Sequence, residues 1–310
     1  MKRKILCLDG GGIKGLFTSQ LLAEIEEKLD CSTFEYFDMI VGTSTGGIIA
    51  AALALGIPAK EICELYIHHA QKIFPQDKRI IRFFQQIGGS KFKNDQLRKQ
   101  LEYVFKDTTI ESCKTRLLIP SYNLTTGRVK VFKTAHSPDL YFDKSEKIVD
   151  VLLSTTAAPT FLPPYKSETG TYIDGGIGAV NPAFIGIVEA VSRCGWDLED
   201  TYMLSLGCME PAKDAPTGKE KMGFNNVAKL VSLFMSAESQ YSDNIAHILL
   251  GGDRYLRINP VDPHNRISLD GAKPDTLTYL RQMGRDKAQV YINQIKSMFF
   301  DAKAEQLVQC

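Results

Sequence analysis

The stretch Met39-Ile-Val-Gly-Thr-Ser-Thr-Gly-Gly-Ile-Ile-Ala-Ala-Ala-Leu-Ala-Leu-Gly56 changes from an apolar strand to an Ala-rich helix within a few residues. The turn between them is centred on Ser44. A serine at such a turn points its hydroxyl away from the strand, at the amino end of the next helix, where free N–H groups and the helix dipole favour negative charge. Gly42 and Gly46 allow the strand and the helix to approach closely. The stretch therefore predicts a nucleophile elbow with Ser44 as the nucleophile.

A second glycine-rich turn lies near the start of the chain. Residues 5–8 predict a buried strand, Asp9-Gly10-Gly11-Gly12-Ile-Lys-Gly15 follows it, and residues 16–29 predict an amphipathic helix. Together with the strand at 39–41 they form a βαβ unit, so the two strands should be parallel with a right-handed crossover. Both glycine turns then lie at the carboxyl edge of the sheet, which is where open α/β sheets place their sites.

The first glycine turn is suited to binding an anion, because successive glycines can turn their N–H groups to one side. The anion could be the oxyanion formed when Ser44 attacks an ester, or a pyrophosphate, since Gly10-x-Gly12-x-x-Gly15 also fits the dinucleotide fingerprint. A dinucleotide site needs an acid ending the second strand, and this strand ends at Val41-Gly42. A phosphate loop of the NTPase kind needs Lys-Ser or Lys-Thr where Leu16-Phe17 stands. The oxyanion is favoured.

Ser44 also needs a base, and the strongest candidate is Asp174. Tyr172-Ile-Asp174-Gly175-Gly176 is a short strand that ends in an acid and two glycines, which lets the acid approach another loop. We predict a two-residue dyad of Ser44 and Asp174. A triad with His247 or His264 would suit the chain order of the α/β-hydrolases, but neither histidine stands in a glycine-bearing loop after a strand.

Further elements follow from periodicity and from capping residues. The segment 78–87 mixes cations with large apolar side chains and is more typical of an ordinary amphipathic helix than of a lipid-facing lid. Asn181 is expected to cap a helix that has Pro182 at its first position. Helices are expected at 58–74, 94–105, 147–158, 224–250 and 275–307, and strands at 115–122, 128–134, 201–206 and 254–258.

Composition narrows the class of protein. The 310 residues are 44% hydrophobic and 24% charged, which is typical of a globular protein, and a net charge of +1 does not indicate a nucleic-acid polymer as partner. The seven cysteines include no Cys-x-x-Cys pair, so we expect neither disulfides nor zinc. The apolar run after the basic start ends at Asp9, which is too short for a signal peptide, and no apolar stretch has the length of a membrane span. We expect a cytoplasmic protein.

Taken together, the motifs resemble the signature set of patatin-like phospholipases. They are Asp9-Gly-Gly-Gly-Ile-Lys-Gly15, Gly42-Thr-Ser-Thr-Gly46-Gly47, Ala157-Ala-Pro-Thr160, Asp174-Gly-Gly176 and Asn181-Pro182, in the family's order and spacing over at least residues 4–190. The resemblance implies a three-layer α/β/α sandwich with a mainly parallel central sheet. It also implies a Ser44–Asp174 dyad without metal or cofactor, and an oxyanion hole made by the backbone N–H groups of Gly10, Gly11, Gly12 and Thr45.

The resulting hypothesis is a single domain over 1–310, with a motif-bearing core at about 4–207 and a helical C-terminal part at about 220–310. It would cleave carboxylic esters of glycerophospholipids at the membrane surface through an acyl-enzyme. A Rossmann-type dinucleotide-binding protein and a catalytically idle lipid-binding module remain as alternatives. Bacterial patatin-like enzymes include anti-phage effectors that a cyclic oligonucleotide switches on to degrade the host membrane, so a cyclic nucleotide activator is a further candidate partner. The ester position, the head group and assembly into a homo-oligomer stay open.

Overall fold

The computed structural model describes residues 1–73, 94–211, 227–263 and 267–310, with side chains described over 1–68, 94–210, 233–263 and 267–310. The helix or lid considered for residues 78–87 lies outside these ranges, and so does His264.

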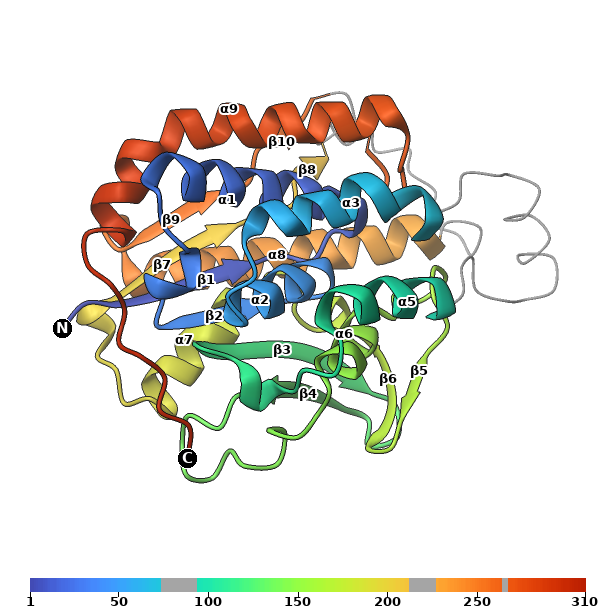
Figure 1. Cartoon of the computed structure of the whole chain (residues 1–310), viewed down its shortest axis with the longest axis horizontal. Coiled ribbons are helices and arrows are strands. Elements are labelled where there is room, and N and C mark those ends of the chain that lie inside the picture. The colour runs from blue at the N-terminus through green and yellow to red at the C-terminus, as the bar shows by residue number, and fades with distance from the viewer. Residues whose placement is uncertain (74–93, 212–226, 264–266) are drawn as a thin grey trace.

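A mainly parallel sheet forms the centre of the molecule (Figure 1). Its parallel strands stand in the order β3 (Arg116–Asn123), β2 (Met39–Gly42), β1 (Arg3–Leu8), β7 (Thr201–Leu206) and β9 (Tyr255–Ile258). As predicted, β1 and β2 are parallel neighbours, and the glycine turns that follow them lie at the same edge of the sheet. The carboxyl edge of these strands is therefore where the site should be sought.

Antiparallel strands extend the sheet beyond β3. They are β4 (Arg128–Lys133), β5 (Tyr165–Ser167) and β6 (Gly170–Asp174). The hairpin of β3 and β4 confirms the two neighbouring strands predicted from the alternation at 115–134. The short strands β5, β8 (Glu210–Pro211) and β10 (Val261–Asp262) were not predicted, because two or three residues carry too little periodicity to be recognised.

The register around β3 brings β2 and β6 end to end. At Leu118 β3 pairs with both β2 and β4, and at Ser121 it pairs with both β4 and β6. Because a strand has only two edges, β2 and β6 must share the edge opposite β4. β2 runs parallel to β3 and β6 antiparallel to it, so their carboxyl ends point toward each other. The turn after β2 and the last residue of β6 therefore meet.

Helices cover both faces of the sheet, which confirms the three-layer sandwich (Figure 1). Leu6 and Leu8 of β1 point into one hydrophobic cluster, while Ile5 and Cys7 point into a second, as the period of two in a strand requires. Helices of the first face are α1 (Gly15–Leu29), α2 (Thr45–Ala54), α3 (Ala59–Ile73), α5 (Asn94–Phe105), α6 (Ile148–Thr156) and α9 (Pro274–Phe299). Helices of the second face are α7 (Ala183–Ser192) and α8 (Val227–Leu250).

The C-terminal segment differs from its prediction. The helix expected over 275–307 ends at Phe299, and residues 300–310 run along the molecule without regular structure. Their backbone groups bond to other segments: the Ala304 N–H donates to the Glu35 carbonyl, and the Cys310 N–H donates to the Ala135 carbonyl. These long-range bonds replace the helical ones, and local propensity could not predict them.

The lengths and compositions of the described helices show whether any of them could span a membrane. None of them combines the length and the apolar composition that a bilayer span requires.

Candidate active site

Ser44 occupies the sharp turn that the sequence predicts. Its backbone has φ 54° and ψ −121°, a conformation that is strained for a residue with a side chain, and it stands at the N-cap of α2. The turn is tight enough to exclude side chains nearby, since a Cβ on Gly46 would lie 2.3 Å from the Leu8 carbonyl oxygen and 2.5 Å from that of Asp9. The backbone therefore presents the Ser44 hydroxyl at the end of the sheet.

The Ser44 hydroxyl meets the carboxylate of Asp174. Ser44 Oγ donates to Asp174 Oδ2 at 2.7 Å, and the Gly176 N–H donates to Asp174 Oδ1 at 2.7 Å. Both side chains are buried, with 9% of Ser44 and 5% of Asp174 exposed. This contact follows from the end-to-end placement of β2 and β6.

Burial changes the proton affinity of Asp174. It raises the pKa of the carboxyl to about 6, against the opposing effect of the hydrogen bonds from Gly176 and Ser44. The carboxyl is still ionised at neutral pH, and it is a stronger base there than an exposed aspartate. A carboxylate with such a pKa can take a proton from the hydroxyl that it contacts.

Thr155 supports the serine turn from the opposite side. Its hydroxyl accepts a hydrogen bond from the Ser44 N–H at 3.0 Å and donates to the Pro120 carbonyl at 2.6 Å. The sequence offered no signal for this residue, because it stands inside the predicted helix at 147–158. Its role depends on a contact between residues 111 positions apart.

The first glycine loop lies against the serine turn, and its N–H groups differ in their hydrogen-bond acceptors. The Gly10 N–H already donates to the Val180 carbonyl at 2.9 Å, and the Gly11 N–H donates to Thr45 Oγ1 at 3.1 Å. Gly12 is the first residue of a short 3-10 helix, so its N–H has no acceptor within that helix. Gly12 also needs to be glycine, since its φ is +60° and a Cβ would lie 2.1 Å from the Leu269 carbonyl oxygen.

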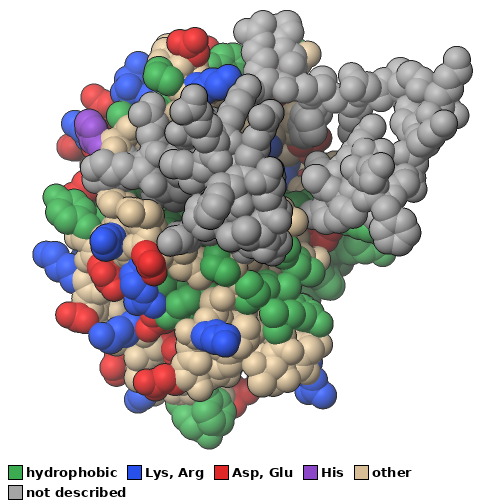
Figure 2. Space-filling model, turned by 90° about the vertical axis from the view of Figure 1, so that its right-hand side faces the viewer, with side chains coloured by type: hydrophobic (Ala, Val, Ile, Leu, Met, Phe, Trp, Pro, Cys, Tyr) green, Lys and Arg blue, Asp and Glu red, His purple; other side chains and the backbone are tan. Residues whose placement is uncertain are grey.

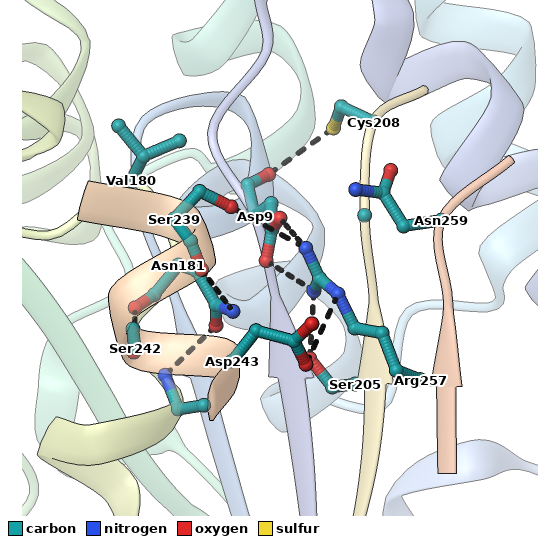
Figure 3. A network of polar contacts seen from close by, with 12 residues as sticks. Asp9, Val180, Asn181, Ser205, Cys208, Ser239, Ser242, Asp243, Arg257 and Asn259 are labelled. Atoms are coloured by element: carbon teal, nitrogen blue, oxygen red, sulfur yellow. Dashed lines mark hydrogen bonds and ion pairs between the residues drawn. The ribbon is translucent and has the colours of Figure 1, made fainter. Parts of the chain in front are cut away.

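Asp9, at the start of this loop, forms a buried ion pair with Arg257 of β9 (Figure 3). Arg257 contacts both carboxylate oxygens of Asp9, with 2.9 Å between Nη1 and Oδ1, and it also donates to Ser205 Oγ at 2.7 Å. A planar guanidinium suits a carboxylate in this two-point contact. Arg257 was not predicted, because it lies 248 residues away from Asp9.

A largely apolar cavity opens at Ser44 and Asp174. Gly10, Gly11, Gly12, Ser44 and Asp174 stand on its wall. The rest of the lining is mostly aliphatic or aromatic and includes Ile48, Leu65, Leu97, Leu101, Phe161, Leu162, Met235 and Leu269. Such a lining excludes water and fits an alkyl chain better than a polar ligand.

The sequence that forms this site matches the model of a known protein family. Residues 6–187 match the model of one family, described as patatin-like phospholipase. The chain belongs to the patatin-like phospholipase family. The matched segment contains the glycine loop, the Ser44 turn and Asp174, and family membership makes the protein a lipid hydrolase.

Similar proteins support this membership across nearly the whole chain. A protein of Escherichia coli named cGAMP-activated phospholipase is 32% identical, with 97% of this chain and 94% of that protein covered. Proteins of the same name from Vibrio cholerae and Pseudomonas aeruginosa are 34% and 38% identical, with 92% of this chain and 90% and 87% of those proteins covered. Among solved structures, VipD from Legionella pneumophila has a TM-score of 0.48 and 15% identity, with 94% of this chain and 67% of that chain covered.

In this patatin-like phospholipase, the histidines with described side chains stand away from Ser44. His68 pairs with Glu64 on the exposed face of α3, His136 contacts Glu189, and His247 packs edge-on against Tyr255. None of these three lines the cavity at Ser44 and Asp174. Among the residues described here, no cluster of three or more His, Cys, Asp or Glu could hold a metal ion.

Family membership also decides between the two interpretations of Gly10-x-Gly12-x-x-Gly15. The loop belongs to the lipid hydrolase and not to a dinucleotide-binding protein. The local pattern alone could not separate them, because both kinds of site place N–H groups at a helix start. Of its glycines, Gly10 lies against the serine turn, since an added Cβ would be 3.3 Å from the Ser44 Cβ and from the Thr43 carbonyl oxygen.

Proposed function

We propose that the protein hydrolyses carboxylic esters of glycerophospholipids through an acyl-enzyme on Ser44. Asp174 takes the proton of the Ser44 hydroxyl, and the oxygen attacks the acyl carbonyl. The tetrahedral intermediate collapses, the proton passes to the leaving lyso-lipid oxygen, and Ser44 keeps the acyl group. Water, deprotonated by Asp174, then attacks the acyl carbon, and Asp174 passes the proton to the departing Ser44 oxygen as the fatty acid is released. The observation that carries this proposal is the 2.7 Å contact between Ser44 Oγ and Asp174 Oδ2 inside an apolar cavity.

The oxyanion would be bound by backbone N–H groups beside Ser44. Thr45 and Gly12 each begin a helix, so their N–H groups have no acceptor within it, and the Gly11 N–H is held only by the Thr45 hydroxyl. These three groups suit the developing negative charge. We assign Gly10 a different role, because its N–H is already bonded to Val180.

Two exposed apolar side chains are sequence neighbours of cavity-lining residues and suit contact with lipid. Ile177 and Phe234 are 49% and 65% exposed, and each directly follows or precedes a residue that lines the cavity, Gly176 and Met235. Figure 2 shows hydrophobic side chains gathered toward the middle and right of one face, with charged side chains mainly to their left. We propose that the enzyme meets the membrane with the mouth of its cavity facing the lipid.

We also propose that a cyclic nucleotide controls the enzyme. Three similar proteins carry the name cGAMP-activated phospholipase, and the similarity spans 92–97% of this chain, including the part beyond the family motifs. A membrane-degrading effector switched on in this way would fit a role in anti-phage defence.

The test is fatty-acid release from phospholipid vesicles with and without added cGAMP. We expect release by the wild type, a higher rate with cGAMP, and no release by Ser44→Ala under either condition. Release by Ser44→Ala would contradict the assigned nucleophile. Vesicle binding without release would favour the idle lipid-binding module, and equal rates with and without cGAMP would contradict the proposed activator.

A further inference from the structure

Glu238 on α8 holds the loop that follows Asp174, although it touches neither member of the dyad. Its Oε2 accepts hydrogen bonds from the N–H of Val180 at 2.6 Å and from the N–H of Asn181 at 3.3 Å. The side chain is half-buried. Two backbone donors on one carboxylate oxygen make charge-assisted bonds, which are stronger than bonds to a neutral acceptor.

The peptide between Val180 and Asn181 connects Glu238 to the glycine loop. Its N–H, which belongs to Asn181, donates to Glu238, and its C=O, which belongs to Val180, accepts from the Gly10 N–H at 2.9 Å. In a trans peptide these two groups point in opposite directions. A carboxylate on the N–H polarises the C=O and strengthens the bond from Gly10, since hydrogen bonds in a chain reinforce one another.

Gly10 is the residue through which this chain of bonds reaches the cavity. It lines the cavity with Gly11, Gly12 and Ser44, and its N–H is fixed by Val180. We propose that Glu238 is a positioning residue that holds the glycine loop in the geometry needed to bind the oxyanion, by way of the Val180–Asn181 peptide. This inference rests on the proposed ester hydrolysis at Ser44.

Other hydrogen bonds hold the same two loops independently of Glu238. The Asn181 side chain donates to the Ser239 carbonyl, and Ser242 Oγ donates to the Asn181 carbonyl, so α8 also holds the loop by neutral bonds (Figure 3). The other end of the glycine loop is fixed by the bond from Ile13 N–H to the Leu269 carbonyl. Loss of Glu238 alone should therefore loosen Gly10 without unfolding the loop.

Burial places the pKa of Glu238 near neutral pH. Burial raises its pKa to about 7, the hydrogen bonds from Asn181 and Val180 lower it, Asp9 raises it and Arg257 lowers it. Asp243 is on the same helix as Glu238, and its Oδ1 lies 3.9 Å from Arg257 Nε. Protonation of Glu238 would replace a charged acceptor with a neutral one, and the bond chain to Gly10 would weaken.

The test compares Glu238→Gln and Glu238→Ala with the wild type on a water-soluble ester, p-nitrophenyl butyrate. Removing an oxyanion donor directly costs roughly 10²–10³ in kcat. Because Glu238 acts through a peptide, we expect a smaller loss of kcat, about 5-fold for Gln and about 30-fold for Ala, with KM within 2-fold. The control is Glu199→Gln, since the Glu199 side chain is 84% exposed and should leave kcat unchanged.

The pH profile separates positioning from general support of the fold. In the wild type both Glu238 and Asp174 lose their charge as the pH falls, whereas in Glu238→Gln only Asp174 does. In a plot of kcat against pH, the midpoint of the decrease on the acid side should therefore move from near pH 7 toward about pH 6 in that variant. An unmoved limb, a change confined to KM, or a kcat of Glu238→Gln within 2-fold of the wild type would overturn the inference.

Two controls make the outcome unambiguous. If Glu238→Ala fails to give a native circular dichroism spectrum, Glu238→Gln decides, because it keeps the length of the side chain. A wild type that neither hydrolyses the ester nor reacts with a serine-directed fluorophosphonate would contradict the proposed function. An active wild type with variants that match it would contradict only the role of Glu238.

Discussion

Asp174 is a buried carboxylate whose negative charge is stabilised by two hydrogen bonds. Those bonds come from Ser44 and Gly176, and within the described part of the chain no Lys or Arg forms an ion pair with Asp174. Burial of a charge without a counter-ion is unfavourable for folding. The Asp174 carboxylate should therefore lower the free energy of unfolding, while its raised pKa makes it a stronger base near neutral pH. Two predictions follow from this single residue.

Asp174→Asn should remove activity and at the same time stabilise the fold. The amide oxygen can still accept from the Gly176 N–H and the NH2 group can donate to Ser44 Oγ, but the amide cannot take a proton, so kcat should fall by about 10²-fold or more. The raised pKa corresponds to about 1–3 kcal/mol of unfavourable charge burial, and the free energy of unfolding should rise by a similar amount. Denaturant unfolding measures this change. A marked loss of stability would show that the carboxylate stabilises the fold.

Activity should fall with a midpoint near pH 6 when Glu238 has been replaced by Gln, because only Asp174 then titrates in that range. The pKa of Asp174 is higher in the folded protein than the unfolded value of about 3.9. Protonation of Asp174 below pH 6 therefore favours the folded state, and its contribution to stability increases as the pH falls. The loss of activity should occur without unfolding, which circular dichroism at pH 5 can check.

Among the secondary-structure elements, β1 and α2 approach each other so closely that the serine turn depends on glycine. A Cβ on Gly46 would meet two carbonyl oxygens of β1 and the loop after it. Backbone oxygens cannot move aside like the end of a flexible side chain. The distance between α2 and β1, and with it the place of Ser44, is therefore set by the absence of a side chain.

Gly46→Ala should destabilise the protein by about 3 kcal/mol, which lies at the upper end of the usual cost of overpacking a core. The matched control is Gly127→Ala, since Gly127 has φ +66° but no atom within 4 Å of an added Cβ. Only the cost of an unfavourable backbone conformation remains there, about 1 kcal/mol. Urea unfolding of both variants measures the difference. Equal losses would mean that contact with β1 does not limit the turn.

The elements next to the site were predicted well where a local pattern exists. The strands at β1, β2 and β7 and the helices at α3, α5 and α6 lie where apolar periodicity, glycine and proline placed them. The helix predicted after Asn181 begins one residue later than expected: Pro182 is the N-cap and Ala183 the first helical residue, while the Asn181 Oδ1 accepts from the Ala183 N–H. The end-to-end arrangement of β2 and β6 could not be predicted, because it depends on the register of both strands on β3.

At the scale of the whole molecule, an ion pair joins the glycine loop after β1 to β9, which lies in the last third of the chain. Arg257 of β9 is 12% exposed and Asp9 is 4% exposed, so this ion pair is shielded from water. Removing one partner of such a pair leaves a buried charge uncompensated, which is far more costly than losing a surface pair.

Arg257→Ala should lower the free energy of unfolding by about 3–5 kcal/mol. The control is Arg193→Ala, because Arg193 and its partner Asp139 are 44% and 52% exposed, and such pairs contribute about 0–1 kcal/mol. Guanidinium chloride would screen the charges, so urea is the denaturant to use. Similar small losses for both variants would show that the Asp9–Arg257 pair is not needed for stability.

The site residues that the sequence could not predict are those that act through contacts with residues far away in the chain. Ser44, Asp174 and the glycine loop each stand in a recognisable pattern of glycines after a strand. Thr155, Glu238 and Arg257 stand inside ordinary helices and strands, and their importance comes only from what the fold brings beside them. For the same reason the sequence could not show that the Gly10 N–H is already taken by Val180.

The most direct measurement is mass spectrometry of the peptide that carries a fluorophosphonate adduct. The wild type should be modified at Ser44, with much slower modification of Asp174→Asn, and Ser44→Ala should stay unmodified under the same conditions. An adduct on another residue, or full modification of Ser44→Ala, would contradict a nucleophile at Ser44 with Asp174 as its base.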